Sequence, residues 1–160
     1  MDHPDSPREL VLQLEREFAR VIETLRQFVT ALAPELLYRR PPIVTIGEHV
    51  LRSAAAIEQT SGGLTANLWD DPFEWTLPES LSNAQLISEY LSEVDNARRL
   101  AFASIASDSQ LTKLIAAPPG EPQQLFSLLL ETLIKASEHH GRAVATCKML
   151  SGETAPGFII

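Results

Sequence analysis

Apolar residues recur along the chain at steps of three and four, which is the spacing of one face of an α-helix. The first such stripe consists of Leu10, Leu14, Phe18, Val21, Leu25, Phe28 and Leu32. Acidic and basic residues lie between them and form a polar face that suits solvent. In front of the stripe, Ser6 has the position of an N-cap and Pro7 that of the first helical residue. The pattern predicts a long helix from Pro7 that ends either near Pro34 or before Pro41 and Pro42.

A second helix is predicted from Thr45, because Glu48 follows it at the spacing of a capping box. Gly62 and Gly63 are expected to end this helix. The stretch that follows, through Pro78, lacks helical periodicity and is too long for a tight turn. It predicts a crossover that passes over the bundle and is held there by its aromatic residues, Trp69 and Trp75 among them.

Two more helices follow the crossover. The third is predicted from an N-cap at Ser82 through Ile105, and the fourth from about Pro122 to Leu150, with Gly152 directly after its end. The apolar stripe of the fourth helix is Leu125, Leu129, Leu133, Ala136, His140, Val144, Cys147 and Leu150.

Helical stripes without the alternation typical of strands predict an all-α fold, a four-helix bundle built by one domain over residues 1–160. The long link between the second and third helices permits an order other than simple up-and-down alternation. The predicted core is Leu14, Phe18, Val21, Leu25, Val50, Ile57, Leu91, Val94, Leu129 and Leu133.

Composition restricts the partners and the compartment. The formal net charge of −8 disfavours nucleic acid as a partner, since an acidic chain repels phosphate backbones. No apolar stretch is long enough to span a membrane, and the N-terminus has no signal-peptide pattern. Cys147 is the single cysteine, so no disulfide forms within the chain. These features predict a cytoplasmic protein without a membrane partner.

Two short segments carry a more specific signal. One is Thr45-Ile46-Gly47-Glu48-His49-Val50-Leu51-Arg52, and the other is Glu138-His139-His140-Gly141-Arg142, which precedes Gly152 by ten residues. With the predicted helix lengths, they make the chain resemble the DinB/YfiT-like helical-bundle family over nearly its whole length. The resemblance implies an up-down-down-up bundle, often dimeric, in which many members hold nickel or zinc on three histidines. Some relatives are transferases or isomerases that act with low-molecular-weight thiols, and most have no assigned activity.

In this chain the family's three ligand positions correspond to Arg52, Ala136 and His140. Ala136 has no donor atom, and Arg52 carries a permanent charge that repels a cation. The resemblance therefore implies a degenerate metal site and no metal cofactor. If a divalent metal such as nickel or zinc binds, His49 and His140 are the expected ligands, since His49 lies one turn before Arg52.

The same residues also fit ordinary structural roles that need no metal. His140 on an apolar stripe is most often a core histidine with one hydrogen bond. His139 lies about 100° around the helix from His140 and is expected at the surface. Cys147 is expected to be a small buried hydrophobic residue. Arg52 is expected to face the interior and approach His140, where it needs an acidic partner or an anionic ligand.

Three functions remain open. The first is a DinB-like protein of unassigned activity that binds a small anionic ligand in a bundle pocket formed by Arg52, His140 and His49. The second is a metal-dependent thiol transferase or hydrolase with a rearranged site at His49 and His140. The third is a homodimer whose assembly is its role. The catalytic residues and the substrate are unknown at this point.

Overall fold

The computed structural model describes residues 7–74 and 78–152. Its long helices are α1 (Glu9–Ala31), α2 (Ile46–Ala66), α3 (Ala84–Ala103) and α4 (Leu125–Ser151). The shorter elements are the 3₁₀ turns η1 (Pro34–Leu36), η2 (Pro72–Glu74) and η3 (Asp108–Thr112) and the strands β1 (Leu114–Ile115) and β2 (Gln123–Gln124).

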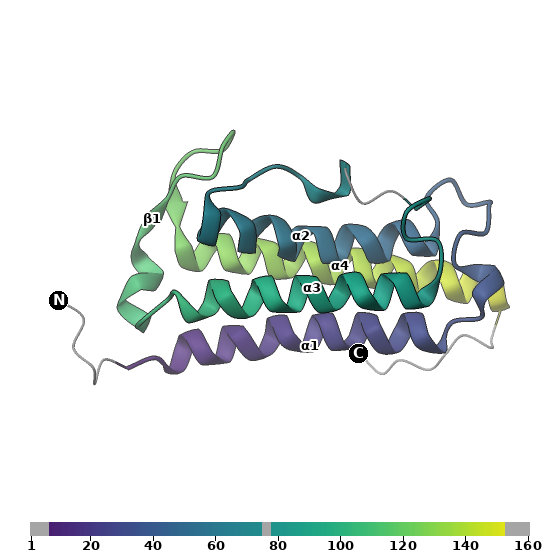
Figure 1. The fold of residues 1–160 in the computed structure, drawn as a ribbon, viewed down its shortest axis with the longest axis horizontal. Helices are drawn as coiled ribbons and strands as arrows, with labels where there is room; N and C mark the ends of the chain where they lie inside the picture. The colour runs from purple at the N-terminus through teal and green to yellow at the C-terminus, as the bar shows by residue number, and fades with distance from the viewer. Residues whose placement is uncertain (1–6, 75–77, 153–160) are drawn as a thin grey trace.

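The long helices lie side by side, and Figure 1 shows α1 and α4 running in one direction and α2 and α3 in the other. The fold is therefore all-α and up-down-down-up, as predicted. α3 packs between α1 and α2, and α2 packs most extensively on α4. Nine members of the predicted core are buried, while Leu133 is half-buried at its edge. Amphipathic periodicity alone was sufficient to find the core because each helix buries one continuous stripe.

The start of α1 differs from the prediction. Helix α1 begins at Glu9 and not at Pro7, its N-cap is Arg8, and Ser6 lies outside the described residues. The carboxylate of Asp108 in η3 accepts hydrogen bonds from the backbone N–H groups of Leu10 (3.1 Å) and Val11 (3.0 Å). A residue about a hundred positions away therefore caps the helix, and no local sequence pattern reveals such a cap.

The capping box at the start of α2 is confirmed. The Thr45 side chain accepts from the Glu48 N–H, and the Glu48 carboxylate accepts from the Thr45 N–H. The predicted end was wrong, because the helix continues to Ala66 and ends on Asn67 in the left-handed conformation. Gly63 is inside the helix for a packing reason, since a Cβ there would lie 2.2 Å from the Trp69 ring.

Residues 67–74 and 78–83 are the described parts of the link between α2 and α3, and residues 67–74 pass over the bundle (Figure 1). Trp69 packs on Gly63 and so holds the first part of the crossover. The Trp69 carbonyl accepts a hydrogen bond of 2.8 Å from the Gln59 side chain. At the other end, the Tyr38 hydroxyl donates to the Leu81 carbonyl (2.5 Å). Trp75 lies outside the described residues.

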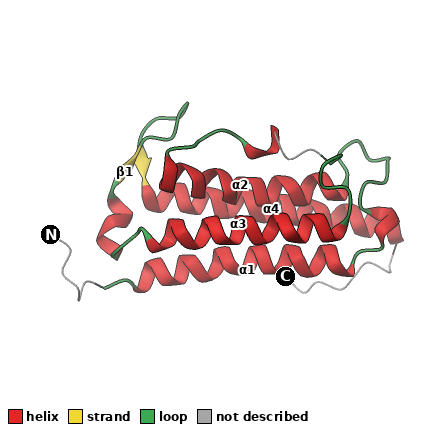
Figure 2. Ribbon diagram, in the orientation of Figure 1, coloured by secondary structure: helices red, strands yellow, loops and turns green. Residues whose placement is uncertain are grey.

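The link between α3 and α4 also departs from the prediction. α3 starts after an Asn83 N-cap and ends at Ala103, short of Ile105, and α4 starts at Leu125 rather than at Pro122. Between them, β1 and β2 pair antiparallel in a small hairpin that no alternating pattern predicted (Figure 2). Strands this short bury too little to leave a period in the sequence. Within the described residues, no helix combines the length and the apolar character needed to cross a membrane.

Candidate functional site

The candidate site lies where α2 faces α4. His49 of α2 and His139 of α4 have ring centroids 6.1 Å apart, with the ring planes inclined by 33°. Both side chains are half-buried. The Nδ1 atom of each ring is buried and has no hydrogen-bond partner among the described residues. A buried polar atom without a partner is uncommon in proteins, so this pair of imidazoles is the first indication of a ligand site.

His140 does not belong to this pair. One residue along α4 turns the side chain by about 100°, so His140 points to α1 while His139 points to α2. The His140 ring meets the Phe28 ring edge-on, with centroids 5.9 Å apart at 86°. The structure brings His49 together with His139, whereas the His140 ring contacts Phe28, and a joint role of His49 and His140 as ligands stays a prediction. His139, which was expected at the surface, is half-buried. His140 Nε2 is also buried and lacks a hydrogen-bond partner in the described part of the chain.

Arg52 is exposed, which corrects its predicted position in the bundle interior. It follows His49 by three residues, which places it on the neighbouring outer face of α2. The guanidinium carbon lies 3.9 Å from the centroid of the Phe73 ring in η2, a cation–π geometry. The crossover thus holds Arg52 beside the histidine pair and away from His140.

The pKa values of His49 and His139 are both lowered, and the causes indicate which charged groups act on each imidazole. Burial lowers the pKa of His49 below its usual 6.5, and Arg142 and Arg52 lower it further, against an opposing effect of Glu48. Burial also lowers the pKa of His139, and Arg142, His49, Arg52 and Lys135 add to that effect.

For His140, burial is the cause of the lowered pKa. Arg52 and Arg142 therefore act on both His49 and His139, and Lys135 acts on His139. Among the described residues, none of these three cations forms an ion pair within 4.0 Å.

Glu48 is the nearest acidic group on α2, but it has other partners. Its carboxylate accepts from the Thr45 N–H (2.7 Å) and contacts the Thr45 hydroxyl (3.0 Å) and Arg40 (3.4 Å). Burial raises its pKa, but the hydrogen bonds from Thr45 and the charges of Arg40 and Arg52 outweigh burial and lower it. Glu48 is thus an ionised helix cap and does not supply a free oxygen to the site.

The residues present do not fit a three-histidine metal centre. Over residues 7–74 and 78–152, no group of three or more His, Cys, Asp or Glu side chains lies in a position to hold a metal ion. The resemblance implies that the ligand positions of the last helix are Ala136 and His140. Ala136 is fully buried, and its carbonyl accepts a 2.6 Å hydrogen bond from the Ser53 hydroxyl. For the pair of His49 and His139, the residue one turn before His139 is Lys135, which is exposed and is no imidazole ligand.

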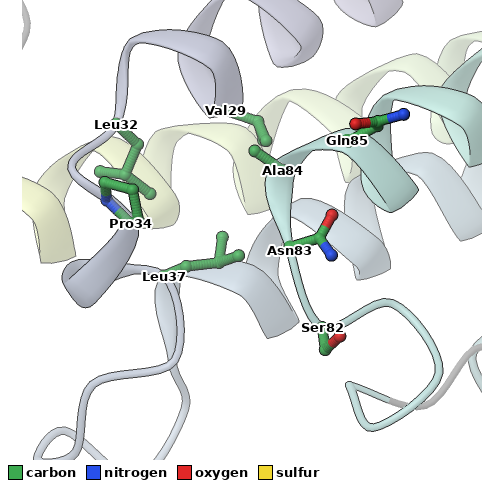
Figure 3. Close-up of a pocket in the computed structure, with 8 residues that line it drawn as sticks. All are labelled: Val29, Leu32, Pro34, Leu37, Ser82, Asn83, Ala84 and Gln85. Atoms are coloured by element: carbon green, nitrogen blue, oxygen red, sulfur yellow. The ribbon is translucent and has the colours of Figure 1, made fainter.

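Two other features, the single cysteine and a cavity, are less suited to a catalytic site. Cys147 is fully buried, as predicted, with its sulfur 4.0 Å from the Ser151 hydroxyl. A cavity of about 360 Å³ lies between the end of α1 and the start of α3 (Figure 3). It is lined by Val29, Leu32, Pro34, Leu37, Ser82, Asn83, Ala84 and Gln85. The described residues that line this cavity have no ionisable side chain, and Asn83 already caps α3.

The up-down-down-up arrangement with a long second link is the fold of DinB-like proteins. A DinB-like protein from Bacillus cereus ATCC 10987, known from a crystal structure at 2.01 Å, superposes with a TM-score of 0.68. The superposition covers 91% of this chain and 95% of that chain, at 20% sequence identity. The chain matches no protein-family model. It also matches no curated protein.

Sequence reasoning missed His139, Arg142 and Lys135. Their spacing places them on one side of α4, since steps of three and four return to the same face. That signal was present in the sequence, but which neighbouring helix this face meets depends on how α2 and α4 pack.

The geometry predicts how a metal site would be created. Lys135→His places a third imidazole one turn before His139, so the variant should bind close to one zinc or nickel ion per chain. We expect the untagged parent and Lys135→Gln, which removes the charge without adding a ligand, to bind far less. Metal content by mass spectrometry after dialysis checks this. A parent that retains about one ion per chain, and loses it in His49→Ala, would contradict the assignment.

Proposed function

We propose that this chain is a DinB-like protein that binds a small anionic ligand at His49 and His139, without a three-histidine metal centre. The observation that carries the proposal is the pair of half-buried imidazoles, with ring centroids 6.1 Å apart and an unpartnered buried nitrogen in each ring. The positive charges of Arg52 and Arg142 act on both rings, and that of Lys135 acts on His139. The proposed binding site differs from the pocket expected from the sequence, because it includes His139 in place of His140.

The charge distribution supports an anion over a cation. A metal ion entering the site would meet fixed positive charges and two neutral donors, and affinity for a cation needs several converging ligands. An anion instead gains guanidinium and ammonium donors together with imidazole N–H groups. Since Arg52 rests on the Phe73 ring, less of its side-chain freedom remains to be lost when the ligand binds.

The metal-dependent alternative used His49 and His140 as joint ligands. In the structure His49 lies beside His139, and His140 lies against Phe28. Thiol transfer with a metal-activated nucleophile therefore has less support here than anion binding.

Anion binding is tested by titrating the protein with sulfate or with acetate and measuring the NMR signals of the His49 and His139 rings. We expect at least one anion to shift these signals, and Arg52→Gln to weaken the binding about five- to tenfold because it removes a charged donor. Arg16→Gln is the matched control, since Arg16 is exposed on α1 away from the site. Affinity should rise as pH falls below about 6.5, because a bound anion favours protonated imidazole and so raises the pKa values that the free protein holds low.

Two results would contradict anion binding at this site. If neither anion shifts the His49 and His139 signals at low ionic strength, the pair is a structural contact and the proposed function fails. If Arg16→Gln weakens binding as much as Arg52→Gln, the effect comes from net charge and not from this site.

We also propose that the chain forms a homodimer through the exposed side of α4. Three apolar side chains of this helix remain exposed: Phe126 by 39%, Ile134 by 58% and Met149 by 64%. A Cβ added at Gly141 would meet nothing within 4 Å, so there is open space at this position of the helix. Exposed apolar side chains favour association with a second copy.

Light scattering at micromolar concentration tests the dimer, for which we expect a mass near twice 17.6 kDa. Ile134→Lys should shift the population to monomer, because it replaces an exposed apolar side chain of the proposed interface by a charge. Leu100→Lys is the control, since Leu100 is similarly exposed on α3. A parent that is monomeric across the concentration range would refute this assembly.

A further inference from the structure

We infer that the cavity between the end of α1 and the start of α3 binds a small uncharged molecule, with an apolar body of about two rings and one oxygen that accepts a hydrogen bond. The cavity shares no lining residue with the proposed anion site, so this is a second site with a different kind of ligand. Four observations carry the inference: the apolar wall of the cavity, its volume, the lack of charge among its lining residues, and the free donors on its α3 side.

The apolar wall of the cavity is part of the hydrophobic core. In Figure 3, Leu32, Pro34 and Leu37 line the α1 side, and Ser82 and Asn83 line the α3 side. Leu32 and Leu37 are only 6% and 4% exposed and pack in the core. Their positions are therefore fixed before a ligand arrives, which reduces what binding must order. Water against such a wall has few hydrogen-bond partners, so an apolar molecule displaces it favourably.

The volume of the cavity sets the size of the ligand. It is about 360 Å³, within the range of roughly 300–1,000 Å³ that is usual for small-molecule sites. A protein cavity of about 150 Å³ holds one benzene molecule. A space slightly more than twice as large suits a bicyclic body with a small substituent, of roughly twelve non-hydrogen atoms in all.

The lining of the cavity carries no charge. None of the described residues around it has an ionisable side chain. Glu35 and Arg39 line a different cavity, which has only Leu32 in common with this one. A charged group that leaves water for this wall meets no counter-charge, and such a transfer is costly. The cavity therefore selects an uncharged molecule over an ion of the same shape.

Free hydrogen-bond donors lie on the α3 side of the cavity. The Asn83 Oδ1 atom accepts a hydrogen bond of 3.0 Å from the Leu86 N–H, so the helix cap uses the amide oxygen and leaves the Nδ2 donor. Within the described residues, neither Asn83 Nδ2 nor the Ser82 hydroxyl has a hydrogen-bond partner. Both side chains are exposed, and an uncharged oxygen of the ligand accepts from them in place of water.

The test uses a matched pair of probes, 2-acetylnaphthalene and 2-naphthoate, which have the same number of non-hydrogen atoms and differ in charge. NMR signals of the Val29, Leu32 and Leu37 methyl groups report binding. We expect 2-acetylnaphthalene to shift these signals with a dissociation constant below about 1 mM, and 2-naphthoate to bind about tenfold or more weakly. The His49 and His139 ring signals should not move with 2-acetylnaphthalene, which separates this site from the anion site.

Two variants test the wall and the donor. Ala84→Leu adds three carbon atoms to a lining side chain, so it should weaken 2-acetylnaphthalene binding about tenfold or more. Ala103→Leu at the other end of α3 is exposed and serves as the matched control, which should change nothing. Asn83→Asp keeps a good helix cap but replaces the amide donor with a carboxylate, so it should weaken binding about three- to tenfold. Because Asp caps helices as well as Asn does, this variant should fold even if Ala84→Leu does not.

Each contrary result overturns a stated part of the inference. No methyl shift with 2-acetylnaphthalene would remove the site, and equally tight binding of 2-naphthoate would contradict the uncharged ligand. Unchanged binding in Asn83→Asp would contradict the hydrogen-bonded oxygen. Methyl signals that change when the protein alone is diluted would identify a second copy of the chain as the occupant. Anion binding at His49 and His139 stands or fails separately, since its probes are sulfate and acetate.

Discussion

The interface between α2 and α4 determines where the side chains of the candidate site meet. Two buried polar contacts cross this interface. The Ser53 hydroxyl donates to the Ala136 carbonyl at 2.6 Å, and the Thr60 and Thr132 hydroxyls are 2.6 Å apart. Because a buried hydroxyl without a partner is costly, sliding or rotating one helix against the other is disfavoured. The antiparallel register that these contacts define brings His49 opposite His139.

The crossover adds the charged part of the site. Trp69 packs against Gly63, where any larger residue would collide with its ring, and this contact ties the start of the crossover to the end of α2. Further along, Phe73 packs against the core and lies under the Arg52 guanidinium. A segment without helical periodicity therefore carries out two tasks: it joins two parallel helices, and it positions a cation beside the histidine pair. The resulting cationic cluster is local, and it stands out because the chain as a whole is acidic.

Much of the fold followed from local patterns. Long stripes of apolar residues gave the helices and nearly all of the predicted core, and the Thr45–Glu48 spacing gave a correct helix start. The errors arose where distant residues decide the outcome. Asp108 caps α1 from across the chain, and the packing of Trp69 lets α2 continue through its glycines.

The site was only partly predictable for the same reason. His49 and Arg52 were found, but His140 was chosen over His139 because it continued the apolar stripe of its helix. A stripe shows which residues face the bundle, and it does not show which neighbouring helix each residue meets. A step of one residue turns a side chain by about 100°, which is sufficient to move it from the α2 side of α4 to the α1 side. Only the packing of the helices, set by contacts such as that of Ser53, distinguishes the two.

The central claim is that His49 and His139 share one cationic environment from which His140 is separate. NMR titration of the imidazole signals in the parent and in Arg142→Gln tests it most directly. In the parent, all three pKa values should lie below 6.5. Removing the Arg142 charge should raise the pKa values of His49 and His139 together and leave that of His140 unchanged. A rise at His140, or no rise at either member of the pair, would contradict this account.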